Sequence, residues 1–117
     1  MIHQGDLYWI HGQDVAGAKL GVHPHPYVIL QEDVFNHSRI ETVVVCALTT
    51  HMKYANAYGN VLLEAGEANL PKRSVVVVSK VSSVNKTQLG NYIGSLSSQR
   101  VAQILAGMRL LQVSFLK

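Results

Sequence analysis

Two histidines alternate with two prolines in the segment HPHP, residues 23–26, directly before an apolar run. A histidine ring gains or loses a proton near neutral pH, and it can also hydrogen-bond or bind a metal. Each proline fixes its own φ angle and biases the residue before it toward an extended conformation. His23 and His25 are therefore expected to be extended, and the two-residue period of a strand would direct both rings to one side. The segment is either a stiff start of a strand with exposed rings or a pair of proton-transfer groups.

A second group of polar side chains follows the apolar run VVVCAL. It contains Thr49, Thr50, His51 and Lys53, and Lys19 lies upstream of HPHP. Hydroxyls and ammonium groups bind anionic oxygens, and histidine acts as an acid or a base. Cleavage within RNA needs such groups, because the neighbouring 2′-hydroxyl is the nucleophile and the protein supplies a base, an acid and donors for the phosphate charge. Taken singly, the threonines also suit an ordinary strand end, and the lysines a solvated surface.

The bulk composition is that of one foldable domain covering residues 1–117. Hydrophobic residues make up 48% of the chain and charged residues 15%, with a net charge of +3, which permits but does not require a polyanionic partner. Cys46 is the only cysteine, so no intrachain disulfide forms, and its apolar neighbours predict a buried thiol. The sequence has no metal-binding motif and no phosphate loop, so we expect neither a metal nor another cofactor. It also has no membrane-spanning or targeting segment, and we expect a cytoplasmic protein.

Apolar periodicity predicts several strands followed by one helix. The expected strands cover residues 6–12, 27–31, 42–48, 61–64 and 74–84, long loops cover 11–26 and 49–60, and a short helical turn within 85–92 ends at Gly90. The run at 42–48 is apolar on both faces, which is typical of a central strand. This order predicts a mainly β (α+β) protein, a small β-barrel or curled antiparallel sheet with a C-terminal helix packed on it.

The expected helix covers residues 97–113. Its apolar residues recur at helical spacing and form one face that we expect to pack against the sheet. This face consists of Val101, Ile104, Leu105, Met108 and Leu111. Ser97 or Ser98 is expected to cap the N-terminus, because a serine hydroxyl accepts a hydrogen bond from a free backbone N–H there.

Taken together, four segments resemble the MazF/PemK family of toxin endoribonucleases over nearly the whole chain. They are GDLYWIHG, HPHPYVILQEDVFN, TVVVCALTTHMK and NLPKRSVVVVSKVSSVNKTQLGNYIGSLSSQRV. The resemblance implies an SH3-like β-barrel and a homodimer. It implies metal-independent cleavage of single-stranded RNA such as mRNA, which leaves a cyclic phosphate and a 5′-hydroxyl. It also implies a cognate antitoxin whose disordered acidic tail covers the RNA-binding surface.

The resemblance implies a catalytic role for Thr49, which matches the threonine of the family. Most family members have Arg-Pro where this sequence has His25 and Pro26, and that arginine is a principal catalytic residue. A subgroup of the family carries the same His-Pro-His pattern. Because histidine exchanges a proton far more readily than arginine, His25 is expected to take over acid–base catalysis. Lys19, His23, Thr50, His51 and Lys53 are expected to bind the RNA.

Two alternatives without catalysis remain open. The substitution at His25 is compatible with a family member that binds RNA but does not cut it. The related CcdB toxins resemble the same barrel and inhibit DNA gyrase by binding it, through their terminal residues. Here the terminal residues, RLLQVSFLK, are apolar and are better suited to helix packing or a dimer contact.

Overall fold

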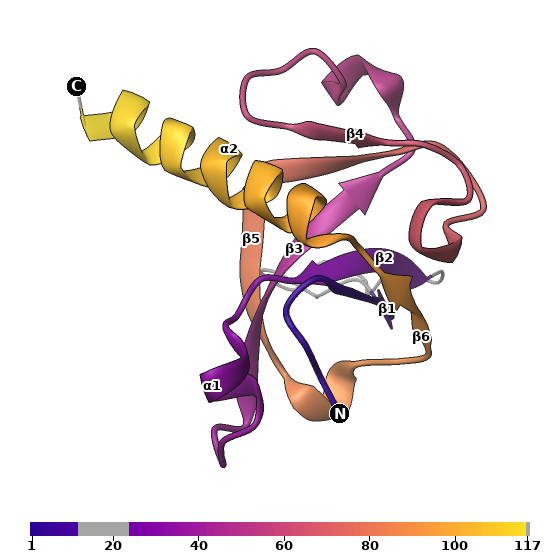
Figure 1. The fold of residues 1–117 in the computed structure, drawn as a ribbon, viewed down its shortest axis with the longest axis vertical. Coiled ribbons are helices and arrows are strands. Elements are labelled where there is room, and N and C mark those ends of the chain that lie inside the picture. Colours follow the sequence, from indigo (N-terminus) through magenta and orange to yellow (C-terminus); the bar gives the residue numbers. More distant parts are fainter. Residues whose placement is uncertain (12–23, 117) are drawn as a thin grey trace, which may run out of the picture.

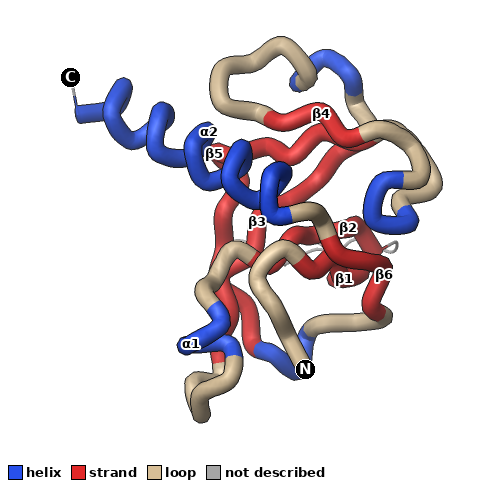
Figure 2. The backbone as a smooth tube through the Cα atoms, viewed as in Figure 1, coloured by secondary structure: helices blue, strands red, loops and turns tan. Residues whose placement is uncertain are grey.

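The computed structural model describes residues 1–11 and 24–116, and a curled antiparallel sheet dominates this part of the chain (Figures 1 and 2). The sheet has six strands in the order β4-β5-β3-β2-β1-β6. The strands are β1 (Asp6–His11), β2 (Pro24–Ile29), β3 (Thr42–Thr49), β4 (Val61–Leu63), β5 (Ser74–Asn85) and β6 (Tyr92–Ser95). The predicted fold, a curled antiparallel sheet with a C-terminal helix, is confirmed.

The central position predicted for the 42–48 run is confirmed, because β3 pairs with β2 on one side and with β5 on the other. Its alternating residues contribute to hydrophobic clusters on both faces of the sheet. The first cluster includes Leu7, Val28, Cys46, Leu48, Val76 and Ile104. The second includes Ile10, Ile29, Val43, Val45 and Val84.

The curl of the sheet brings β6 against the short 3₁₀ helix η2 (Glu67–Asn69), which follows β4. Asn69 Nδ2 donates a hydrogen bond of 3.0 Å to the carbonyl oxygen of Ile93. Gly94 lies so close to the backbone of Ala68 that a Cβ at this position would collide with the Ala68 carbonyl group. The two edge strands are thus joined through η2, and Gly94 makes this close approach sterically possible.

The C-terminal helix α2 (Ser98–Leu116) packs on β5 and β4 (Figure 1). Ser97 is the residue that caps it, because its Oγ accepts the N–H of Arg100 at 3.2 Å. The predicted apolar face was wrong in two of its members. Ile104 is fully buried, but Leu105 and Leu111 are 39% and 43% exposed.

Leu105 and Leu111 are exposed because α2 contacts the rest of the protein through a narrow strip of its surface, and this strip includes a glycine. Gly107 is buried directly against Gly59, and a Cβ at Gly107 would collide with the Gly59 carbonyl oxygen. This close contact of two backbones draws one side of the helix inward and leaves the leucines beside it in solvent.

The connections hold short helical turns, and several details differ from the prediction. The turn predicted after β5 is present as η3 (Lys86–Gln88), although it ends before Gly90. The polar connection after β2 contains the one-turn helix α1 (Asp33–Asn36), and the loop after β3 contains η1 (Met52–Tyr54). Strand β6 was not predicted.

No helix in the described part of the chain is long and apolar enough to cross a membrane.

Candidate active site

The proline-containing segment forms the first half of β2 rather than a loop before it, which corrects the predicted strand start at residue 27. Among the described strands this half pairs with β1 alone, since the β2–β3 ladder covers only Tyr27–Ile29. The N–H of Leu30 donates to the Val44 carbonyl, so even-numbered residues of β2 direct their backbone groups toward β3. Pro24 and Pro26 therefore lack their N–H on the side where no partner strand is paired, and the sheet loses no hydrogen bond.

His25 lies within this half of β2, opposite the buried Ile10 of β1, and its own side chain is exposed. Its ring cannot be compared with that of His23, since residues 12–23 lie outside the described part of the chain. The same holds for Lys19. The prediction that both histidine rings point to one side therefore stays a prediction.

The register of β2 and β3, extended past its last pair, aligns His25 with Thr49. Tyr27 pairs with Ala47, and moving two residues along each strand in opposite directions leads to His25 on β2 and Thr49 on β3. Both lie just beyond the last ladder pair and on the same face of the sheet. The two residues that the sequence singled out for catalysis thus lie on neighbouring strands and on the same face of the sheet, beyond the last paired residues.

Tyr27 is the next residue along β2 on this face and packs against the second hydrophobic cluster. Burial raises the pKa of its phenol, and the Cys46 side chain raises it further. The phenol therefore stays protonated at neutral pH, and Tyr27 is a neutral hydrogen-bond donor on the same face of the sheet as His25 and Thr49.

The residues after Thr49 turn away from the strand. The N–H of His51 donates a hydrogen bond of 3.2 Å to Thr49 Oγ1, which fixes the turn and the hydroxyl together. Thr49 is half-buried, whereas Thr50, His51 and Lys53 are exposed. The predicted binding residues in this loop are accordingly accessible to a ligand.

Lys53 belongs to a cationic and aromatic surface that sequence reasoning described only in part. Its Nζ lies 5.2 Å from the ring centroid of Tyr54, and Lys80 Nζ lies 5.3 Å from the same centroid. The ring therefore has two ammonium groups beside it, an arrangement stabilised by the attraction between a cation and an aromatic face. We call Lys53, Tyr54 and Lys80 the lysine–tyrosine patch.

Lys80 was missed because its position depends on an irregularity in the sheet. Cys46 pairs with Val81 and Leu48 with Val76, so Ala47 alone stands opposite the β5 stretch Val77–Lys80. This bulge moves Lys80 out of the regular ladder and toward η1. The interrupted apolar pattern VVVVSKV is the sequence signal that could have located it.

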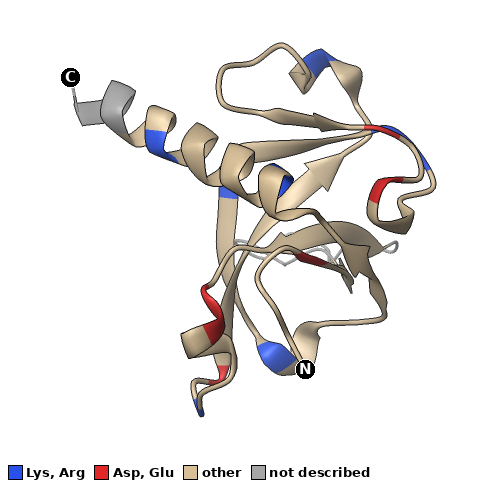
Figure 3. Ribbon diagram, in the orientation of Figure 1, with Lys and Arg blue, Asp and Glu red and all other residues tan. Residues whose placement is uncertain are grey.

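The charged residues are distributed unevenly over the fold (Figure 3). Acidic residues lie on the α1 segment, at the start of β1 and in the connection after β4. The loop between β3 and β4 contains Lys53 and no acidic residue. An anionic ligand at the end of β3 would therefore meet positive charge from the lysine–tyrosine patch and little repulsion from its own side of the sheet.

A separate cluster of possible metal ligands lies beyond the opposite end of β2. His3, Asp33 and His37 each offer one ligand atom, and these atoms lie within 4.8 Å of one another. This group has no signal in the sequence, because His3 is about thirty residues from the other two and no short motif connects them.

Comparison with known proteins shows the same fold in toxins. The chain resembles MazF from Deinococcus radiodurans (TM-score 0.75, 19% identity, covering 95% of this chain and 96% of that one). It also resembles a mycobacterial endoribonuclease solved in complex with its cognate antitoxin (TM-score 0.74, 18% identity, 94% and 93% covered). Among curated sequences, the endoribonuclease MazF2 of Mycobacterium bovis is 29% identical over 109 residues, which cover 93% of this chain and 95% of that protein.

The family profile described as the PemK-like, MazF-like toxin of type II toxin–antitoxin systems matches residues 3–111. This range includes every described strand and most of α2. The chain therefore belongs to the PemK-like, MazF-like toxins of type II toxin–antitoxin systems.

Proposed function

We propose that this toxin is an endoribonuclease that cleaves single-stranded RNA, including mRNA in the cytoplasm, with His25 and Thr49 as its catalytic residues. The observation that supports the proposal is the β2–β3 register, which would align these two residues if it continued two positions beyond the last pair, Tyr27 with Ala47. The relatives named as endoribonucleases support the same reaction class. They do not favour the alternative of a gyrase inhibitor.

In the proposed reaction, the 2′-hydroxyl of the RNA attacks the adjacent phosphorus. A bond forms between the 2′-oxygen and phosphorus, and the bond from phosphorus to the 5′-oxygen breaks, which gives a cyclic phosphate and a 5′-hydroxyl. His25 takes the proton of the attacking hydroxyl, and a second histidine, His23 or His51, supplies the proton to the leaving oxygen. Thr49 and the neutral phenol of Tyr27 donate hydrogen bonds to the phosphate oxygens. Every step uses groups of the chain itself, so we propose metal-independent cleavage.

The RNA is proposed to run along the end of β3 and the loop that follows it. Thr50 and His51 contact the phosphates there, and the lysine–tyrosine patch supplies positive charge and an aromatic ring on which a base can stack. We propose that Lys19 and His23 contribute from the segment before β2.

We propose that the toxin is inhibited by an antitoxin with a disordered acidic tail, and that it acts as a homodimer. The mycobacterial structure in complex with its cognate antitoxin supports a partner of this kind. An acidic peptide would be attracted by the same lysine–tyrosine patch as RNA, so it would compete with the substrate.

The test is incubation of the purified protein with a long unstructured RNA in EDTA, across about pH 5 to 9. Cut sites are mapped by primer extension, and product ends are identified by mass spectrometry. We expect specific cuts with cyclic-phosphate ends. His25→Ala and Thr49→Ala should each lower the rate by about a hundredfold or more.

His11→Ala is the matched control, because His11 is an exposed histidine on the neighbouring strand whose side chain lies on the other face of the sheet. It should cut at the wild-type rate. His25→Arg restores the residue that most family members carry, so it should keep activity but change the pH profile. Intact RNA with a correctly folded wild-type protein would refute the proposal and favour a toxin that only binds its target.

A further inference from the structure

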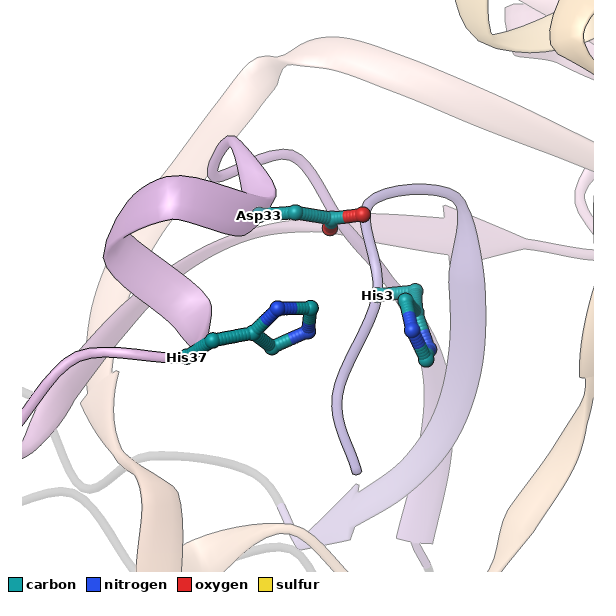
Figure 4. A group of neighbouring side chains, drawn as sticks. All are labelled: His3, Asp33 and His37. Carbon is teal, nitrogen blue, oxygen red and sulfur yellow. The ribbon is translucent and has the colours of Figure 1, made fainter.

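The cluster of His3, Asp33 and His37 joins two segments that are far apart in sequence (Figure 4). His3 precedes β1, whereas Asp33 and His37 lie at the two ends of α1. Their spacing of four residues places Asp33 and His37 on one face of this helical turn. Figure 4 shows the carboxylate and the two rings around a common space.

A backbone carbonyl selects the tautomer of the His37 ring. Its Nε2 lies 2.8 Å from the carbonyl oxygen of Ile2, which can only accept a hydrogen bond. In the neutral tautomer of this ring the proton is therefore assigned to Nε2, and Nδ1 offers its lone pair. A histidine that binds a metal through one nitrogen usually donates its other N–H to a carbonyl or carboxylate in this way.

The side chain of Asp33 is a carboxylate, and one of its two oxygens accepts hydrogen bonds from the protein. Its Oδ1 accepts hydrogen bonds from the N–H of Gln4 at 2.6 Å and from Asn36 Nδ2 at 3.2 Å. The Gln4 N–H is the largest cause of a lowered pKa for this carboxyl group, and Asn36, His3 and His37 lower it further against the opposing effect of burial. The hydrogen bonds to Oδ1 leave Oδ2 as the oxygen that can bind a cation.

His3 completes the group from the other segment. Its ring packs edge-on against the His37 ring, with centroids 4.9 Å apart and an interplanar angle of 82°. Its backbone N–H donates to Asp6 Oδ2 at 3.0 Å, which fixes the start of the side chain. The side chain itself is 51% exposed, so it can rotate to meet a ligand.

We propose that His3, Asp33 and His37 form a binding site for one divalent first-row transition metal ion, with Zn²⁺ as the reference ion. Two imidazole nitrogens and one carboxylate oxygen are a ligand set that zinc commonly takes, with water in the fourth position. Calcium and magnesium prefer sites made of oxygen ligands. The ligand atoms of a tetrahedral zinc site lie about 3.3 Å apart, so binding would draw the His3 ring inward from its present position.

A metal at this site would act as a cross-link rather than as a catalyst. It would tie the segment before β1 to the turn after β2, and it would stabilise the folded state because the unfolded chain does not hold the three ligands together. The site is independent of RNA cleavage, which is expected to proceed in EDTA. Failure of one proposal would therefore leave the other intact.

The test uses untagged protein freed of metal with a chelator. Zinc affinity is measured by competition with a chromogenic chelator, and the melting temperature is measured with and without Zn²⁺. Cobalt provides a second probe, because its visible absorption reports coordination by nitrogen and oxygen. We expect one ion per chain, and a rise in melting temperature of roughly 10 °C at free zinc a hundred times its dissociation constant.

His3→Ala, His37→Ala and Asp33→Asn should each weaken zinc binding by about tenfold or more. Asp33→Asn keeps an oxygen that can accept the Gln4 N–H, so it tests the charge with the local fold retained. His11→Ala, which removes an exposed histidine outside the cluster, should bind zinc as the wild type does. The proposal is overturned if wild-type protein binds no zinc, or if the three cluster variants bind it as tightly as the His11→Ala control.

Discussion

Arg100 at the start of α2 makes a two-pronged ion pair with Glu67 of η2. Its Nε lies 2.7 Å from Glu67 Oε1, and its Nη2 lies 3.0 Å from Oε2. The N–H of Glu64 also donates to Oε2 at 2.9 Å. Because η2 joins the two edges of the curled sheet, this pair connects the helix to that junction.

The ion pair predicts an acid-sensitive contribution to stability. The hydrogen bond from Arg100 is the main cause of the lowered pKa of Glu67, with a further contribution from the N–H of Glu64. A carboxyl group whose pKa is lowered on folding stabilises the protein above its unfolded pKa, and this stability is lost as pH falls through the folded pKa. Glu67→Gln should therefore cost about 1 kcal/mol at pH 7 and almost nothing in strong acid. Urea unfolding of both proteins at several pH values measures this difference, and a pH-independent difference would contradict the prediction.

The lysine–tyrosine patch predicts a specific change in the salt dependence of RNA binding. Each phosphate contact by a lysine contributes about 0.7 to the slope of log affinity against log salt for a single strand. Lys53→Ala and Lys80→Ala should each reduce the slope by roughly that amount, measured by fluorescence anisotropy with the inactive Thr49→Ala protein. Arg39→Ala, an exposed basic residue beyond the other end of β3, is the control and should leave the slope unchanged.

Tyr54 is expected to contribute through its ring rather than its hydroxyl group. Tyr54→Phe should bind RNA as tightly as the parent protein, whereas Tyr54→Ala should lose about 1 to 3 kcal/mol if a base stacks on the ring. Anisotropy at one fixed salt concentration distinguishes the two variants. Equal affinities for Phe and Ala would show that no base stacks there.

The contact between Gly107 and Gly59 predicts that a better helix former will destabilise α2. Alanine is favoured over glycine by about 1 kcal/mol within a helix, but a Cβ at Gly107 would collide with the Gly59 carbonyl oxygen. Gly107→Ala should therefore lower the free energy of unfolding by about 1 to 3 kcal/mol. Ala102→Gly, an exposed position on the same helix, measures the propensity effect alone. A Gly107→Ala protein more stable than the wild type would contradict this contact.

Cys46 is predicted to be unreactive in the native protein. It is fully buried, its Sγ donates to the Val77 carbonyl oxygen at 3.0 Å, and burial raises the pKa of its thiol to about 12. The thiolate is the reactive form, so a thiol reagent at pH 8 should label the protein only as fast as it unfolds. The labelling rate should rise with urea along the unfolding transition, and rapid labelling without urea would contradict the buried position.

Most of the fold could be predicted because its strands have strong local patterns. The apolar run in Thr42–Thr49 indicated a central strand, and the structure confirms it. Strand β6 was missed because Tyr92–Ser95 is short and contains glycine and serine, and it exists through pairing with β1. The start of β2 was misplaced because prolines usually end a strand, and they are tolerated here only where β3 is not paired.

The candidate site depends more heavily on long-range geometry. The sequence suggested His25 and Thr49 individually, but their alignment depends on the β2–β3 register, which residue types alone do not determine. Lys80 reaches Tyr54 only through the bulge in β5. His3 contacts His37 because the segment that follows β2 packs against the N-terminal residues, and no local spacing in the sequence could indicate that contact.

The two prolines of β2 also affect whether a strand of another polypeptide can pair with the edge of the sheet. An unpaired strand edge normally invites a foreign strand, which extends the sheet through alternating donors and acceptors and can begin aggregation. Along the part of β2 beyond the β3 ladder, Pro24 and Pro26 offer carbonyl groups but no donors. A polypeptide backbone cannot complete a ladder there. The proposed RNA substrate would be recognised through phosphates and bases and would not need those donors, so among the described residues this part of the β2 edge is protected from pairing with another polypeptide strand.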